Sequence, residues 1–379
     1  MPGAARGRWG WRLRRLLAGV ALLAGSDALS VTWSHAGDLG LPTASIASAT
    51  PAPDPTRPGI ALATAPIDLP DPLLLDEGGR YALFVSTAFG DYAHNVPVLE
   101  GRPGGAWSVV RDSLPALPAW AVPANGTNTG GLTWAPSLHR FGSTWVMYFS
   151  ATVRGWDLHH CIGTATSTNP LGPFRPDPSP LVCQRAHGGD IDAEVYLDRS
   201  APGAAKAYLI WKSDDNSLKS GSPPKDEVPS IWAQPLSGDG RRLLGRPAVI
   251  FRADRSWQHQ LVEAPQLVNG PDGRLWLFYS GGYSYHSPGG YGVGVAGCAG
   301  PLGPCRSVTR GPLLTDNAQG RGVGEETVFV GRDGSAWIVY NPWSTGQSPG
   351  VLRPAEAARI GWGPAGPFVA RAGAFPDPS

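Results

Sequence analysis

One hairpin pattern occurs five times along this chain, and this repeat constrains the fold more than any other feature of the sequence. Each copy is a short apolar run, a turn rich in glycine and polar residues, and a second run that opens on an aromatic residue. That order is typical of a β-hairpin. The copies begin at Pro70, Trp134, Asp192, Glu263 and Glu325. Their second runs open at Tyr81, Trp145, Tyr208, Trp276 and Trp337.

The spacing of the copies predicts a propeller. We take as equivalent Pro72, Pro136, Glu194, Pro265 and Thr327. These recur at intervals of about 60 to 70 residues, longer than a hairpin and suited to a four-stranded blade with long loops. Amphipathic helices of ordinary length are not indicated between the copies. We therefore predict an all-β fold, a five-bladed β-propeller, with a β-sandwich as the structural alternative.

The N-terminal region has the pattern of an export signal. Several arginines precede the apolar run 16–25, which is too short to span a bilayer. Small residues suited to signal peptidase stand at 26–28 and again at 34–36. We predict a signal peptide over 1–28, with cleavage as late as residue 36 or a retained membrane anchor as alternatives. Residues 37–66, rich in Ala, Pro, Thr and Ser, are predicted to be a linker, and 67–379 the propeller domain.

Composition narrows the partners and the compartment. A net charge of +1 and 16% charged residues provide no long-range electrostatic field that would attract nucleic acid or an anionic membrane. A neutral partner therefore fits best. Four cysteines behind an export signal predict two disulfides in a secreted, extracellular protein. The parsimonious pairs are Cys161 with Cys183 and Cys298 with Cys305, and free buried thiols are the alternative. Neither pair has the spacing of a zinc site.

Carboxylic acids stand where the blades begin. The first strand of each blade lines the central channel of a propeller, so Asp71, Asp192, Glu263 and either Glu325 or Glu326 are predicted to approach one axis. A carboxylate at the start of an apolar strand is costly to bury, which favours a functional role. If the register of the third copy slips by two residues, Asp190 or Glu194 takes the place of Asp192. The second copy has Trp134 at the matching place.

Glycoside hydrolysis needs such a set of acids. One carboxyl protonates the leaving oxygen while another activates water or attacks the anomeric carbon. A third acid nearby can orient the first and keep it protonated through like-charge repulsion. Trp134 is a candidate to stack on a sugar ring, with a core position nearly as well supported, and Phe89 is a weaker candidate for a sugar-binding wall.

The order of these motifs resembles glycoside hydrolase family 43, the five-bladed propeller family of arabinanases, arabinofuranosidases and β-xylosidases. The resemblance runs from about residue 67 to 368. Its motifs are matched by Asp71-Pro72, Trp134-Ala135-Pro136, Ile191-Asp192 and Glu263-Ala264-Pro265. It implies an inverting mechanism in which Asp71 is the general base, Glu263 the general acid and Asp192 the residue that tunes and orients the acid.

The fifth copy departs from the family pattern. Many members have Gly-x-Gly-His there, with a histidine that assists a bound calcium or other ion, whereas this chain has Gly322-Val323-Gly324-Glu325. The Glu325 carboxylate is a candidate ligand for a structural Ca²⁺ in the central channel, because hard cations favour oxygen. It could instead pair with Arg321 and make the ion unnecessary. We expect no cofactor to be required for activity.

The resemblance implies an oligosaccharide or polysaccharide substrate containing arabinose or xylose, and an arabinanase or arabinofuranosidase is favoured. A monomer is expected, without membrane attachment after signal removal. The alternative function is a non-catalytic carbohydrate-binding or interaction propeller. A related five-bladed family that acts on fructosides ranks last, because the Trp-Met-Asn-Asp-Pro motif expected of invertases is missing around Asp71.

Overall fold

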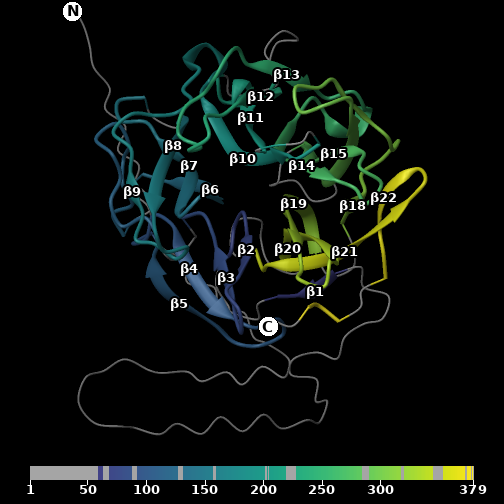
Figure 1. Ribbon diagram of the computed structural model, residues 1–379, viewed down its shortest axis with the longest axis horizontal. Helices are drawn as coiled ribbons and strands as arrows, with labels where there is room; N and C mark the ends of the chain where they lie inside the picture. Colours follow the sequence, from purple (N-terminus) through teal and green to yellow (C-terminus); the bar gives the residue numbers. More distant parts are fainter. Residues whose placement is uncertain are drawn as a thin grey trace, which may run out of the picture. The chain divides into compact units, whose positions relative to one another are not determined.

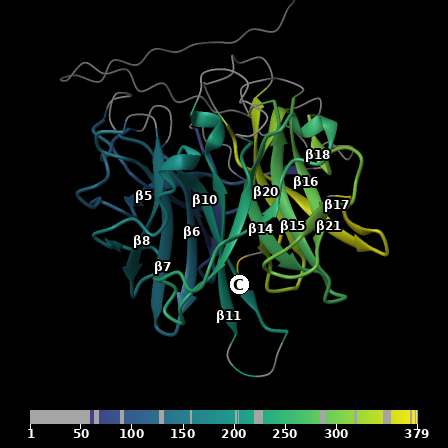
Figure 2. The ribbon, with the colours of Figure 1, turned by 90° about the horizontal axis from the view of Figure 1, so that it is seen from above.

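The computed structural model describes residues 59–62, 68–87, 92–126, 131–156, 159–200, 203, 205–218, 228–283, 290–316, 320–344, 353–371, 374–376 and 378. Five antiparallel sheets are arranged around a common axis, as Figures 1 and 2 show, so the predicted five-bladed β-propeller is confirmed. The predicted signal peptide lies outside the described residues.

Four blades follow the chain in simple order, from the inner strand to the outer one. Blade 1 contains β2 (Leu73–Asp76), β3 (Tyr81–Phe84), β4 (Pro97–Gly101) and β5 (Trp107–Asp112). Blade 2 contains β6 (Thr133–Phe141), β7 (Thr144–Thr152), β8 (His160–Ser167) and β9 (Arg175–Pro176). Blade 3 contains β10 (Asp190–Asp198), β11 (Lys206–Ser213), β12 (Ile231–Pro235) and β13 (Ala248–Phe251). Blade 4 contains β14 (Val262–Asn269), β15 (Leu275–Gly282), β16 (Tyr291–Cys298), β17 (Cys305–Ser307) and β18 (Leu314–Thr315), and both β17 and β18 pair with β16.

Blade 5 is built from both ends of the described chain. It contains β19 (Gly320–Val330), β20 (Ala336–Ser344), β21 (Glu356–Gly363), β22 (Gly366–Val369) and the N-terminal β1 (Gly59–Ala61). Both β1 and β22 pair with β21, β1 along Glu356–Ala358 and β22 along Ile360–Gly363. The propeller therefore begins at β1, before the boundary at residue 67 that composition indicated, because a three-residue strand needs little apolar sequence when it is added to an existing sheet edge.

The hydrophobic core is divided into five clusters, one between each pair of neighbouring blades. In the second strand of a blade, successive side chains pack into different clusters, because they point to opposite faces of the sheet. In β3, for example, Tyr81 and Leu83 pack towards blade 5, while Ala82 and Phe84 pack towards blade 2. Such a strand is buried on both faces, which explains why the second runs of the repeat are continuously apolar.

Short helices and disulfides complete the fold. In the part of the chain that is described, the helical elements are single 3₁₀ turns, namely η1 (Arg185–His187), η2 (Asp215–Ser217) and η3 (Ser256–Gln258). None of the described helices is long and apolar enough to cross a membrane. Both predicted disulfides, Cys161–Cys183 and Cys298–Cys305, are present.

Candidate active site

One residue near the start of each blade has a left-handed backbone, with φ between 44° and 57°. These residues are Asp71, Ala135, Asp192, Ala264 and Glu325. In blades 2 to 5 the pairing of the first two strands shifts at this point, as it does at a β-bulge. The equivalent positions that follow are therefore Pro72, Pro136, Ala193, Pro265 and Glu326. Our alignment of the third and fifth copies on Glu194 and Thr327 was wrong by one residue, because these two copies lack the proline that marks the position in the other three.

A ring of hydrogen bonds holds these left-handed residues in place. On the second strand of each blade, or two residues after it in blade 1, one residue lies opposite the residue that precedes the left-handed one. These residues are Ser86, Ser150, Lys212, Ser280 and Asn341. In four blades this side chain accepts the backbone N–H of the left-handed residue in the next blade. The donors are Ala135 (2.8 Å), Asp192 (3.2 Å), Glu325 (2.9 Å) and Asp71 (2.8 Å).

Blade 3 breaks this rule. Lys212 has no acceptor atom on its side chain, so the N–H of Ala264 is instead donated to Asp192 Oδ2 at 3.0 Å. The ring stays closed through the carboxylate of Asp192. The Lys212 side chain is thereby free to make other contacts, described below.

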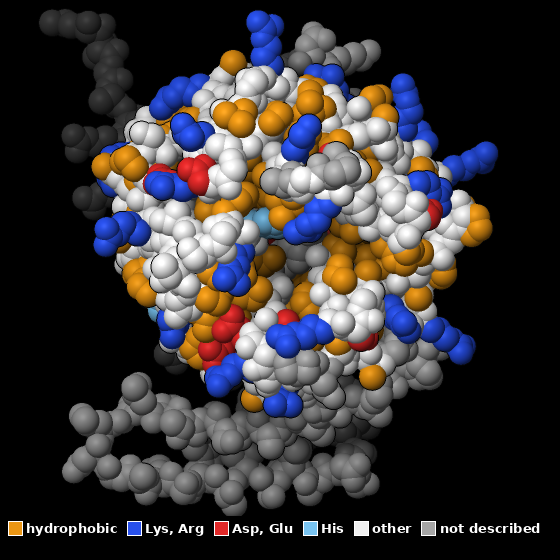
Figure 3. Space-filling model, viewed as in Figure 1, with side chains coloured by type: hydrophobic (Ala, Val, Ile, Leu, Met, Phe, Trp, Pro, Cys, Tyr) orange, Lys and Arg blue, Asp and Glu red, His pale blue; other side chains and the backbone are white. Residues whose placement is uncertain are grey.

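The three predicted acids line a single cavity of about 500 Å³ at the axis. Asp71, Asp192 and Glu263 contribute to its wall, together with Glu325 and Trp134. The face drawn in Figure 3 is hollowed near its centre. The starts of the first strands, bulged in blades 2 to 5, bring these residues together from five separate blades, as the repeat predicted.

Asp71 and Asp192 are held by neutral donors. Asp71 Oδ2 accepts a short hydrogen bond from Ser86 Oγ, the same hydroxyl that accepts the N–H of Ala135. Asp192 accepts from the Ala264 N–H through Oδ2, while its own N–H is donated to Ser150. Both carboxyl groups are therefore fixed by the ring contacts.

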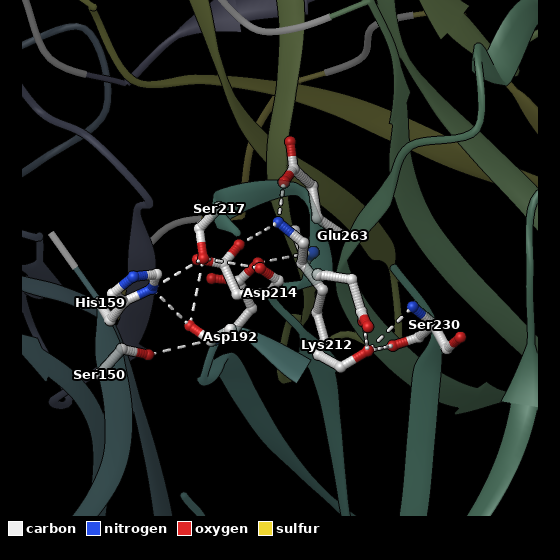
Figure 4. A network of polar contacts seen from close by, with 12 residues as sticks. Ser150, His159, Asp192, Lys212, Asp214, Ser217, Ser230 and Glu263 are labelled. Carbon is white, nitrogen blue, oxygen red and sulfur yellow. Dashed lines mark hydrogen bonds and ion pairs between the residues drawn. The ribbon is translucent and has the colours of Figure 1, made fainter. Parts of the chain in front are cut away.

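Glu263 has a different environment, shown in part in Figure 4. Its Oε2 accepts from Lys212 Nζ at 2.8 Å, and its Oε1 accepts from Tyr291 Oη at 2.7 Å. Lys212 Nζ also donates to Asp214 at 3.1 Å. Lys212 and Glu263 are 1% and 6% exposed, so this is a buried ion pair at the cavity wall. Both oxygens of Glu263 thus have strong donors.

Burial and mutual repulsion raise the pKa of several cavity acids. Burial raises the pKa of Asp192 to about 7, with Lys212 opposing the shift and Glu263 adding to it. Burial also raises the pKa of Asp71, against the charge of Arg353. Burial, with the charge of Glu263 next, raises the pKa of Glu325 well above its usual value. The cavity therefore holds several carboxyl groups whose pKa values are raised by burial and by one another, an arrangement typical of acid/base sites.

Tyr291 links two of these acids. Its Oη lies 2.7 Å from Glu263 Oε1 and 2.6 Å from Glu325 Oε1. The phenol has one proton, and burial raises its pKa well above the usual value, so one of the two contacts must be donated by a carboxyl proton. The raised pKa of Glu325 identifies it as the carboxyl that carries this proton.

Of the two aromatic residues predicted to bind sugar, Trp134 and Phe89, only Trp134 is among the described residues. Trp134 lines the cavity and is half-buried, with His160 stacked on it at a centroid distance of 3.7 Å. Its role in sugar binding stays a prediction. Phe89 lies outside the described residues.

The alternatives to Asp192 do not line this cavity. Asp190 accepts from the Gln184 N–H and from Trp211 Nε1 at 2.9 Å, and burial raises its pKa to about 7. Glu194 instead lines a second, narrower cavity of about 40 Å³ further along the axis, together with Glu326. Asp192 is thus the acid of β10 that lines the larger cavity.

Among the described residues, no set of ligands surrounds the calcium position predicted at Glu325. Within the described ranges, no group of three or more His, Cys, Asp or Glu side chains is placed to hold a metal ion. The Glu325 carboxyl contacts Tyr291, and the side chain of Arg321 lies outside what is described. Calcium at Glu325 stays a prediction, and no step proposed below uses an ion.

Two residues of the site, Lys212 and Tyr291, were not predicted from the sequence. A signal for Lys212 exists, since the second strands of the other blades have serine or asparagine where blade 3 has lysine. A lysine at the end of the apolar run Ala207–Trp211 needs a buried partner, which the repeat alone does not name. Tyr291 opens a third strand, and the repeat used here covered only the first two strands of each blade.

Comparison with known proteins decides the family. Residues 63–368 match the model of the family described as glycosyl hydrolases family 43. The chain belongs to glycoside hydrolase family 43. It is therefore a glycosidase, with a carbohydrate substrate. No curated protein sequence matches the chain.

Solved structures share the family 43 fold at low identity. A thermostable family-43 glycoside hydrolase matches with a TM-score of 0.68 and 24% identity, covering 84% of this chain and 98% of its own. An endo-1,4-β-xylanase from Bacteroides thetaiotaomicron matches with a TM-score of 0.62 and 22% identity over 80% and 94%. An exo-1,5-α-L-arabinanase from a bovine ruminal metagenomic library matches with a TM-score of 0.58 and 19% identity over 81% and 99%.

Proposed function

We propose that this chain is an exported glycosidase that cleaves arabinose- or xylose-containing plant polysaccharide with inversion at the anomeric carbon. The observation that carries the proposal is the meeting of Asp71 and Glu263, from blades 1 and 4, in one cavity. Its volume of about 500 Å³ is that of a small-ligand site. The family membership and the xylanase and arabinanase neighbours support a pentose substrate.

In the proposed reaction Glu263 is the general acid and Asp71 the general base. The Glu263 proton passes to the glycosidic oxygen as the bond from that oxygen to the anomeric carbon breaks, and the bonding electrons stay on the leaving oxygen. Asp71 takes a proton from the water that attacks the anomeric carbon from the opposite face. Asp192 keeps the proton on Glu263 through its negative charge. Inversion requires the two carboxyl groups to lie roughly 6.5 to 9.5 Å apart.

One observation favours the alternative function, a non-catalytic carbohydrate-binding propeller. The Lys212 cation neutralises Glu263 at 2.8 Å. An acid permanently held as a carboxylate could not donate a proton. If the protein is a carbohydrate-binding propeller, it should therefore bind the same sugars without hydrolysing them.

A substrate screen separates the two functions. Purified protein is incubated with arabinan, arabinoxylan, xylan, aryl α-L-arabinofuranosides and aryl β-D-xylosides, and the products are analysed. We expect release of pentose or pentose oligosaccharides from at least one of them, and proton NMR of the first product should show the inverted anomer. Hydrolysis of none, together with binding of a polysaccharide in a calorimetric titration, would establish the binding function instead. A first product with retained anomeric configuration would still establish a glycosidase, but it would exclude the roles of Glu263 as general acid and Asp71 as general base in an inverting reaction.

Export rests on the N-terminal pattern and on the two disulfides, which are consistent with an oxidising compartment. We expect the protein expressed with its native N-terminus in a bacterial host to accumulate outside the cytoplasm. N-terminal sequencing should find cleavage after residue 28 or, at the latest, residue 36. We also expect a monomer in solution, which light scattering measures.

A further inference from the structure

Lys212 interrupts a contact that the other four blades share. Ser86, Ser150, Ser280 and Asn341 each accept an N–H from the next blade at the equivalent place. Lysine cannot accept, and Asp192 takes over the contact with Ala264. The departure therefore has a structural cost that is compensated next to it, and it brings a cation to the wall of the cavity.

The cation is fully charged where it lies. Burial alone would lower the pKa of Lys212, but the negative charges of Glu263, Asp214 and Asp192 outweigh burial and raise it. Nζ lies 2.8 Å from Glu263 and 3.1 Å from Asp214, both buried. A buried lysine between two carboxyl groups could serve the fold alone. In that case, however, the serine or asparagine found in the other blades would serve equally well.

We propose that Lys212 is a positioning residue that strengthens Glu263 as the proton donor, an inference that rests on the proposed glycosidase function. When the O–H bond of Glu263 breaks and its proton moves to the glycosidic oxygen, negative charge develops on the Glu263 carboxylate. Hydrogen bonds from Lys212 and Tyr291 to a carboxylate are stronger than those to a neutral carboxyl. The two contacts therefore stabilise the transition state more than the protonated ground state.

Other charged groups around Glu263 oppose this effect. Asp192 on β10 adds negative charge that opposes a second negative charge on Glu263, whereas burial raises the pKa of Glu325 and Glu326 on β19 and favours their neutral forms. Lys212 on β11 is the cation in contact with Glu263 among the described residues. Glu263 thus lies between one anion, Asp192, that opposes the loss of its proton and one cation, Lys212, that favours it.

The test compares substrates that differ only in how much they need a proton. Aryl glycosides of the sugar accepted by the wild-type enzyme are prepared with phenols of graded acidity, because an acidic phenol leaves without protonation. In Lys212→Met, kcat/KM should fall at least about tenfold for the least acidic phenol and much less for dinitrophenol. The dependence of rate on phenol acidity therefore becomes steeper than in the wild type.

Two matched variants complete the design. Lys212→Ser restores the residue type of blades 1, 2 and 4 without a cation, and should show the same steeper dependence even if Lys212→Met folds poorly. Lys212→Arg retains the charge and should recover the wild-type dependence in part. An equal loss for every phenol, or no loss, would overturn the role of Lys212 while leaving the glycosidase proposal intact. An inactive wild-type enzyme would overturn the proposed function and this inference with it.

Discussion

Asp192 shows how the position of one residue in the ring determines its chemistry. Its backbone is left-handed, its N–H is bound by Ser150 of the preceding blade, and its carboxylate binds the N–H of Ala264 in the next one. Burial raises its pKa to about 7. An aspartate so enclosed has one orientation, and above pH 7 its charge is directed at its neighbours in the cavity.

Replacing Asp192 tests its role beside the proposed acid. In Asp192→Asn the amide oxygen can still accept the Ala264 N–H, but the negative charge is lost. Without that charge the proton on Glu263 leaves more readily, so the basic limb of the kcat/KM profile should move to lower pH, by about one unit. The profile is measured between pH 5 and 9. A basic limb that stays in place, or moves to higher pH, contradicts the tuning role.

At the residue scale, the sequence predicted the acids but not their partners. Asp71, Asp192 and Glu263 could be recognised because acids at the start of apolar strands are rare and the repeat puts those starts on one axis. Lys212 could not be assigned to Glu263, because the contact joins two blades and depends on the direction of a long side chain. The role of Asp71 as general base stays a prediction.

At the element scale, the bulged first strands carry the acidic residues of the axis. The hairpins were predictable from alternating apolar runs and turns. The bulges were not, since one additional residue in a strand leaves no mark on the hydrophobic pattern. The third and fifth copies were misaligned because they lack the proline that follows the left-handed residue in the other three. The same geometry directs Glu194 into the narrow second cavity, where burial raises its pKa to about 7.

This shift predicts how stability depends on pH. The pKa of Glu194 in the folded protein lies above the ordinary glutamate value of 4.5. Between these two values the folded chain holds a proton that the unfolded chain has lost, so the free energy of unfolding falls as pH rises from about 4.5 to 7. Glu194→Gln should be more stable than the wild type at pH 8, by about 1 kcal/mol or more. Urea unfolding at pH 5 and pH 8 measures this, and an equal effect at both pH values would contradict it.

At the scale of the whole propeller, β1 joins the start of the domain to its last blade. It pairs with β21, and the next residue, Leu62, is fully buried between blades 5 and 1 and accepts the indole N–H of Trp107. The five-bladed ring was predictable from the repeat, but this closure was not. The three residues of β1 lie in a segment of linker-like composition, and their sequence alone does not indicate a strand. They form one because they pair with the edge of β21.

Two N-terminal truncations test the closure. A chain that starts at residue 51 retains β1, whereas one that starts at residue 67 lacks it. Loss of the β1 pairing and of the buried Leu62 should lower the melting temperature of the shorter chain by several degrees, since burying one leucine contributes about 2 kcal/mol. The chain that starts at residue 51 should melt at the same temperature as a third chain, which starts at residue 37. Equal melting temperatures for the chains starting at 51 and 67 would show that β1 does not stabilise the ring.

The most direct measurement of the central claim is the turnover of Glu263→Gln on the best oligosaccharide from the substrate screen. Glutamine has nearly the same shape as glutamate and cannot donate the proton, so kcat should fall at least about 100-fold while circular dichroism and the melting temperature show an intact propeller. Activity close to that of the wild type would mean that Glu263 is not the acid and would contradict the account.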